Sequence, residues 1–85
     1  MARILIIDDE QDIRVLLGDL FKGAGYEVEI AANGKEAMDR CKDKQVDLMI
    51  TDIIMPEMEG VETIGNFLKM FPKIKIIAIN IAIGN

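Results

Sequence analysis

Three aspartates stand where apolar segments of the chain end. Asp8 and Asp9 follow the run Ile4-Leu5-Ile6-Ile7, and Asp52 closes the segment Asp47-Leu48-Met49-Ile50-Thr51. Each segment is typical of a buried strand, and a helical pattern follows it. In a parallel α/β sheet, ligands bind in the crevice beyond the carboxyl ends of the strands. If the two strands are neighbours, three carboxylates meet there, and like charges so close stay ionised only around a cation.

Three carboxylates suit a hard divalent cation with oxygen ligands, and Mg²⁺ fits a half-open site that keeps several waters. We expect Asp9 and Asp52 to be direct ligands, Asp8 to bind directly or through water, and the backbone carbonyl of Ile54 to complete the set. Such a metal is either structural or orients a phosphoryl donor against a carboxylate nucleophile. The simpler alternative is that Asp8 is a turn residue and Asp9 a helix N-cap. The doublet combined with Asp52 favours the metal site.

The elements that position these acids alternate between strand and helix. Strands are expected at about residues 3–8, 26–31, 46–51 and 73–80, with helices between them that begin near residues 11, 34 and 60. This alternation predicts a parallel sheet with right-handed crossovers. The first and third strands are the most continuously apolar, so they should be central and adjacent, whereas the second alternates as an edge strand does. The predicted inward stripes of the three helices are Ile13, Leu16, Leu17, Leu20 and Phe21; Ala37, Met38 and Cys41; and Val61, Ile64, Leu68 and Phe71.

Length, charge and cysteine content narrow the class of protein. The chain has 85 residues, of which 51% are hydrophobic, so we expect a single domain over residues 1–85 and no disordered tail. Its net charge of -5 and scattered bases argue against direct nucleic-acid binding. No apolar run approaches a membrane-spanning length. Cys41 is the only cysteine, which excludes an intrachain disulfide and indicates a reducing, cytoplasmic location.

The sequence resembles the receiver domain of bacterial two-component response regulators. The resemblance lies in Ile-Leu-Ile-Ile-Asp8-Asp9-Glu10 and in Asp47-Leu-Met-Ile-Thr-Asp52 followed by Met55-Pro56-Glu57-Met58-Glu59-Gly60. It implies a flavodoxin-like (CheY-like) fold with strand order 2-1-3-4 and three helices, lacking the last helix–strand–helix portion. Proteins of this family are among those from which the generalisation about ligand sites at strand ends was drawn. The generalisation therefore does not support the resemblance independently.

The resemblance also implies a function. Asp52 would accept a phosphoryl group from the histidine of a sensor histidine kinase, with Mg²⁺ held by Asp8, Asp9, Asp52 and the carbonyl of Ile54. The domain would then be a phosphoacceptor in a phosphorelay rather than an enzyme.

Two family features are missing from this sequence. Receivers carry a Ser or Thr at the end of the fourth strand, where this chain has Asn80, whose amide could still donate a hydrogen bond to the phosphoryl group. The family lysine of the fifth strand has no counterpart. Lys73 and Lys75 lie at the far end of the fourth strand, roughly 20 Å away at about 3.3 Å per residue. Arg14 is interpreted as a solvated or N-terminal-turn residue and therefore does not replace that lysine. Without a positive group beside the phosphoryl oxygens, we expect impaired switching.

The end of the chain suggests a second function. Without a fifth strand, the Ile-rich strand Ile74–Ile83 would form an uncovered apolar sheet edge, and such edges pair with other chains. Three hypotheses therefore remain: a phosphoacceptor signalling domain, a non-switching fragment that self-associates as an assembly or interaction module, and a metal-binding α/β module without phosphoryl chemistry.

Overall fold

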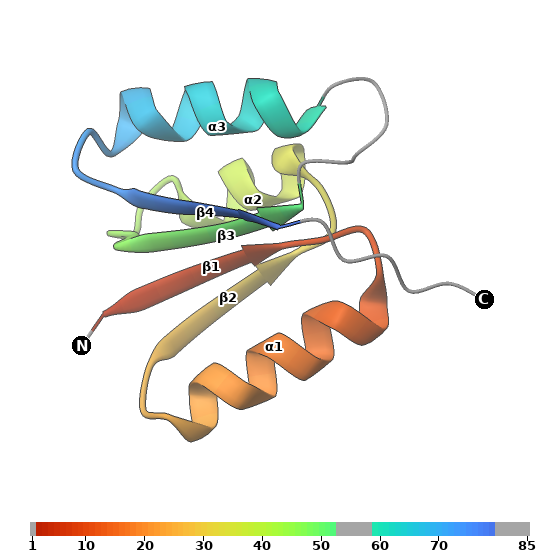
Figure 1. Cartoon of the computed structure of the whole chain (residues 1–85). Coiled ribbons are helices and arrows are strands. Elements are labelled where there is room, and N and C mark those ends of the chain that lie inside the picture. The colour runs from red at the N-terminus through yellow and green to blue at the C-terminus, as the bar shows by residue number, and fades with distance from the viewer. Residues whose placement is uncertain (1, 53–58, 80–85) are drawn as a thin grey trace.

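The computed structural model describes residues 2–52 and 59–79 (Figure 1). In that part of the chain, four parallel strands form one sheet in the order β2-β1-β3-β4. This confirms the predicted order, with the first and third strands at the centre. The elements are β1 (Arg3–Ile7), α1 (Gln11–Gly23), β2 (Glu27–Ala31), α2 (Gly34–Cys41), β3 (Leu48–Asp52), α3 (Glu59–Met70) and β4 (Lys75–Ile79).

The helices cover the two faces of the sheet unequally. Figure 1 shows α1 on one face and both α2 and α3 on the other. On the α2 and α3 face, the buried core gathers Leu5, Ile7, Ala31, Ala37, Cys41, Val46, Met49, Phe67 and Ile74. On the α1 face, the buried side chains are Ile4, Ile6 and Ile50, against which Leu17 and Phe21 pack. Because β1 and β3 contribute to both cores, they are buried from both sides.

Local signals explain where the helices begin and end. The side chain of Asn33 accepts a hydrogen bond of 2.8 Å from the backbone N–H of Glu36, which is an N-cap contact for α2. Gly25 has a φ of 97°, a left-handed conformation that glycine adopts without strain, in the turn that follows α1. The start of α2 at Gly34 agrees with the helix start predicted near residue 34.

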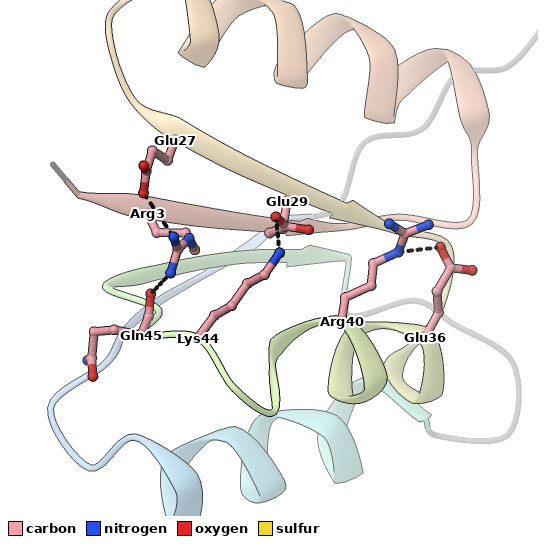
Figure 2. A network of polar contacts seen from close by, with 7 residues as sticks. All are labelled: Arg3, Glu27, Glu29, Glu36, Arg40, Lys44 and Gln45. Carbon is pink, nitrogen blue, oxygen red and sulfur yellow. Dashed lines mark hydrogen bonds and ion pairs between the residues drawn. The ribbon is translucent and has the colours of Figure 1, made fainter.

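Polar contacts link the first three strands (Figure 2). The guanidinium of Arg3 on β1 donates to Glu27 of β2 at 3.0 Å and to the carbonyl of Gln45, shortly before β3, at 3.1 Å. Lys44 pairs with Glu29 of β2 at 2.7 Å. Exposed ion pairs of this kind contribute little free energy each. Their geometry is consistent with the register that brings the ends of β1 and β3 to the same edge.

The inward stripes of two helices agree with the predictions in part. In α1, Ile13 is buried and Leu17 and Phe21 pack against the core, as predicted. In α1, Leu16 and Leu20 are 64% and 61% exposed, because the helix packs on the β1–β2 half of the sheet. A Cβ at buried Gly18 would lie 3.5 Å from Cγ2 of Ile30, so the side of α1 that carries Gly18 lies close to β2. Leu16 and Leu20 lie on the opposite side of the helix.

In α3, the buried residues are Thr63 and Phe67, whereas Val61 and Leu68 are exposed. Ile64 and Phe71 pack partly buried against the core as predicted, so half of the predicted stripe is confirmed. Because threonine is not counted as an apolar residue, the apolar pattern does not predict that Thr63 faces inward.

Cys41 is buried at the inward position predicted for it on α2, and this burial raises the pKa of its thiol.

Within residues 2–52 and 59–79, no helix combines the length and apolar character needed to cross a membrane.

Candidate metal centre

The acidic residues meet at the carboxyl edge of the sheet. Ile7 of β1 pairs with Thr51 of β3, so the residues that follow them, Asp8 and Asp52, emerge side by side. One carboxylate oxygen each from Asp8, Asp9 and Asp52 lies within 4.8 Å of the others. This confirms the juxtaposition predicted from the sequence. Asp8 and Asp52 are buried and Asp9 is exposed, so the cluster is open to solvent on the side of Asp9.

Asp8 is held through three different groups. Its backbone N–H donates to the carbonyl of Ala31 at 3.1 Å, its Oδ1 accepts from the N–H of Glu10 at 2.8 Å, and its carbonyl accepts from Arg14 at 2.7 Å. The contact to Glu10 is an Asx turn, so Asp8 is both a turn residue and a member of the cluster. Asp9 is not the N-cap of α1. That position is Glu10, whose side chain makes no cap hydrogen bond.

The electrostatics of Asp8 show why the cluster suits a cation. Burial raises the pKa of Asp8, and repulsion from Asp52, Asp9 and Glu10 raises it further, while the hydrogen bond from Glu10 lowers it in part. The charged form of Asp8 is therefore costly unless a positive charge compensates it. Three carboxylate oxygens in a partly open cluster are the donor set that Mg²⁺ accepts in proteins, so these residues fit that metal.

The raised pKa gives a testable pH dependence. Since folded Asp8 binds its proton more tightly than unfolded Asp8, its contribution to stability without metal is greatest below the unfolded pKa of about 4 and is lost as pH rises through the folded pKa. We expect Asp8→Asn to raise the free energy of unfolding at neutral pH in EDTA, with little effect near pH 4.

Urea unfolding at several pH values in EDTA measures this difference. The matched control is Asp19→Asn, which removes an exposed acid of α1 and should leave the pH dependence unchanged. Parallel pH profiles for the unsubstituted chain and the Asp8 variant would contradict the expectation.

Other predicted site residues have different outcomes. Ile54 and Asn80 lie outside the described residues, so their assigned roles stay predictions. Lys75 pairs with Leu48, while Asp52 pairs with Ile79, so Lys75 is at the opposite end of β4 as expected. Arg14 is more than solvated: it lies in the first turn of α1 and its half-buried side chain bonds to the Asp8 carbonyl. Apart from the arginine six residues after Asp8, no pattern of residues indicates this contact.

The protein is thus a parallel α/β domain with three carboxylates gathered at the carboxyl edge of its sheet. The family model for the response regulator receiver domain matches residues 4–83, and the chain belongs to this family. Chemotaxis protein CheY of Thermotoga maritima is 43% identical over 76 residues, which cover 88% of this chain and 63% of that protein. The chain thus spans less than two thirds of the length of this relative.

Two solved structures are similar in fold and sequence. Response regulator TrrA from Thermotoga maritima, in complex with Mg²⁺-BeF, is 41% identical with a TM-score of 0.82, and the match covers 94% of this chain and 70% of that one. The same regulator in complex with histidine kinase ThkA gives 39% identity and a TM-score of 0.82, with 99% and 72% of the chains covered.

Proposed function

We propose that residues 1–85 form a receiver domain in which Asp52 accepts a phosphoryl group from the histidine of a sensor histidine kinase. Mg²⁺ would be held by Asp8, Asp9 and Asp52, with the Ile54 carbonyl as a further ligand. The observation that carries this proposal is the approach of three carboxylates to within 4.8 Å of one another. The solved relatives with Mg²⁺-BeF and with a histidine kinase support the choice of metal and partner.

The environments of the three acids support Asp52 as the acceptor. The carboxylate of Asp8 accepts the Glu10 N–H, and its raised pKa disfavours the ionised form that a nucleophile needs. Asp52 ends the central strand β3 and is mostly buried, so its position is set by the sheet. A carboxylate oxygen of Asp52 would form the new bond to phosphorus as the bond from phosphorus to the histidine nitrogen breaks, with that electron pair leaving on the imidazole. When bound, the metal supplies charge neutralisation at the phosphoryl oxygens.

A reaction with a small phosphodonor tests the proposal without a kinase. The chain is incubated with acetyl phosphate and Mg²⁺, and its mass is measured with and without excess EDTA. We expect a mass gain of one phosphoryl group, located on the peptide that contains Asp52, and no gain with EDTA. Magnesium binding without any mass gain would refute phosphoacceptor activity and leave a metal-binding module.

The rest of the proposal concerns location and switching. A reducing, cytoplasmic location is supported by Cys41, which is a buried free thiol. Lys75 lies at the end of β4 opposite the acidic edge, so this lysine does not contact a phosphoryl group on Asp52. A positive group beside the phosphoryl oxygens is a large stabilising term in such sites. As an acceptor, the domain would be a substrate of its kinase rather than an enzyme.

A second candidate function is self-association through β4. The supporting observation is that β4 is an edge strand of the described sheet and that Ile77 on it is 49% exposed. Ile77 pairs with Ile50 and so lies on the α1 face, where Leu16 and Leu20 are also exposed. An uncovered apolar edge favours pairing with a second copy. The remainder of the predicted strand Ile74–Ile83, beyond Ile79, lies outside the described residues.

Ile77→Lys tests this association, since a charge at the edge opposes strand pairing. We expect sedimentation at micromolar concentration to show dimers or larger species for the unsubstituted chain and monomers for the variant. Val61→Lys is the matched control, because Val61 is an exposed apolar residue of α3 and should have no effect. A monomeric unsubstituted chain would rule out this function.

A further inference from the structure

We propose that Arg14 is a positioning residue for the metal-binding carboxylates, which holds the β1–α1 turn in the geometry that brings Asp8 and Asp9 to Asp52. The inference rests on the proposed metal site and adds a residue to it that touches neither the metal nor the phosphoryl group.

Arg14 makes two hydrogen bonds across the turn. Its guanidinium donates to the carbonyl of Asp8 at 2.7 Å, and its backbone N–H donates to the carbonyl of Glu10 at 3.1 Å. One residue of α1 thus binds two carbonyls of the three-residue turn that carries the acidic doublet. The neighbouring Ile13 is buried in the core, which fixes this part of α1 against the sheet.

The hydrogen bond from Arg14 to the Asp8 carbonyl also affects the orientation of Asp9. The Asp8 carbonyl belongs to the planar peptide that joins Asp8 to Asp9, so fixing this oxygen fixes the orientation of the plane. That plane helps to set the direction in which the Asp9 side chain leaves the backbone. The N–H of Asp8 is already held by Ala31 and its carboxylate by Glu10. The Arg14 contact restrains the remaining polar group of Asp8, and a charged donor makes it one of the stronger hydrogen bonds of the turn.

A positioning role and a purely electrostatic role of Arg14 have opposite effects on the affinity for Mg²⁺. A guanidinium near a cation site repels the cation, so if Arg14 acted through its charge alone, neutralising it would tighten Mg²⁺ binding. If Arg14 acts by fixing the turn, the same substitution loosens the ligands and weakens binding. The two roles predict changes of opposite sign in one measured quantity. A purely structural role would lower thermal stability and leave the affinity of the folded chain unchanged.

Calorimetric titration of the full chain with Mg²⁺ alone is the deciding experiment. We expect Arg14→Met to weaken the affinity about tenfold, the lower end of the loss seen when a group that orients metal ligands is removed. Arg14→Lys should recover most of the affinity, because an ammonium can donate to the same carbonyl. Arg40→Met is the matched control: it also removes one guanidinium, from the exposed pair with Glu36 on α2, and should leave the affinity unchanged.

Each result decides one claim. Unchanged or tighter binding by folded Arg14→Met overturns the positioning role while the metal site stands. No binding by the unsubstituted chain overturns the metal site and this inference with it. If circular dichroism shows that Arg14→Met is unfolded, Arg14→Gln takes its place with the same expected loss, because its shorter side chain does not span the distance to the Asp8 carbonyl.

Discussion

Asp52→Asn is expected to abolish metal-dependent phosphorylation and, in the absence of metal, to make the folded chain more stable. The first effect follows because an amide oxygen is a far weaker nucleophile than a carboxylate and cannot form the same acyl phosphate. The second follows from repulsion, since the cluster holds three carboxylate oxygens within 4.8 Å. Two charges at such a distance repel by roughly 1 to 3 kcal/mol, depending on how far solvent at the open side screens them.

The two effects are measured on one preparation. Mass spectrometry after incubation with acetyl phosphate and Mg²⁺ reports the phosphoryl group, and urea unfolding in EDTA reports the free energy of unfolding. Asp19→Asn again serves as the control, because it removes an exposed acid of α1 and should change neither quantity. Phosphorylation that persists in the Asp52 variant would show that another residue is the acceptor.

A third readout connects stability to metal binding. We expect added Mg²⁺ to stabilise the unsubstituted chain by mass action, because the proposed site exists only in the folded state, in which the acids are gathered. In Asp52→Asn this stabilisation should be much reduced, since one of the three carboxylates is gone. A variant that is more stable without metal and barely responds to Mg²⁺ is the combined result expected of a charge cluster built to hold a cation.

The acidic cluster could be predicted from the sequence because its causes are local. Apolar runs end at Asp8 and Asp52, strands of continuous apolar character pair at the centre of a parallel sheet, and their carboxyl ends then coincide. Strand order and helix starts follow from similar local signals, such as the cap at Asn33. These features depend on residue type and spacing alone.

Other features depend on three-dimensional contacts that residue types do not encode. The hydrogen bond from Arg14 joins a side chain to a backbone carbonyl, and every residue offers such a carbonyl. Thr63 of α3 is buried, and a count of apolar residues leaves it out of the inward stripe. The exposure of Leu16 depends on how much of the sheet α1 covers.

Phe67→Ala is expected to cause a large loss in the free energy of unfolding. Phe67 is fully buried between α3 and the sheet, and its ring stacks on Phe71 with centroids 6.0 Å apart. Truncating a buried phenylalanine to alanine costs about 3 to 5 kcal/mol, because apolar area is exposed and a cavity is left. A domain of 85 residues has a total stability of roughly 4 to 13 kcal/mol. The variant should therefore lose roughly a quarter or more of the stability, and it would be unfolded at room temperature if the total lies at the lower figure.

The matched control is the next residue of the same helix. Leu68 is 45% exposed, so Leu68→Ala removes a large apolar side chain without opening a comparable cavity, and alanine keeps the helix propensity high. We expect it to cost about 1 kcal/mol or less, measured with Phe67→Ala by urea unfolding under identical conditions. The comparison decides which stripe of α3 faces the sheet. A larger loss for Leu68→Ala than for Phe67→Ala would support the stripe predicted from the apolar pattern and contradict the packing in the structure.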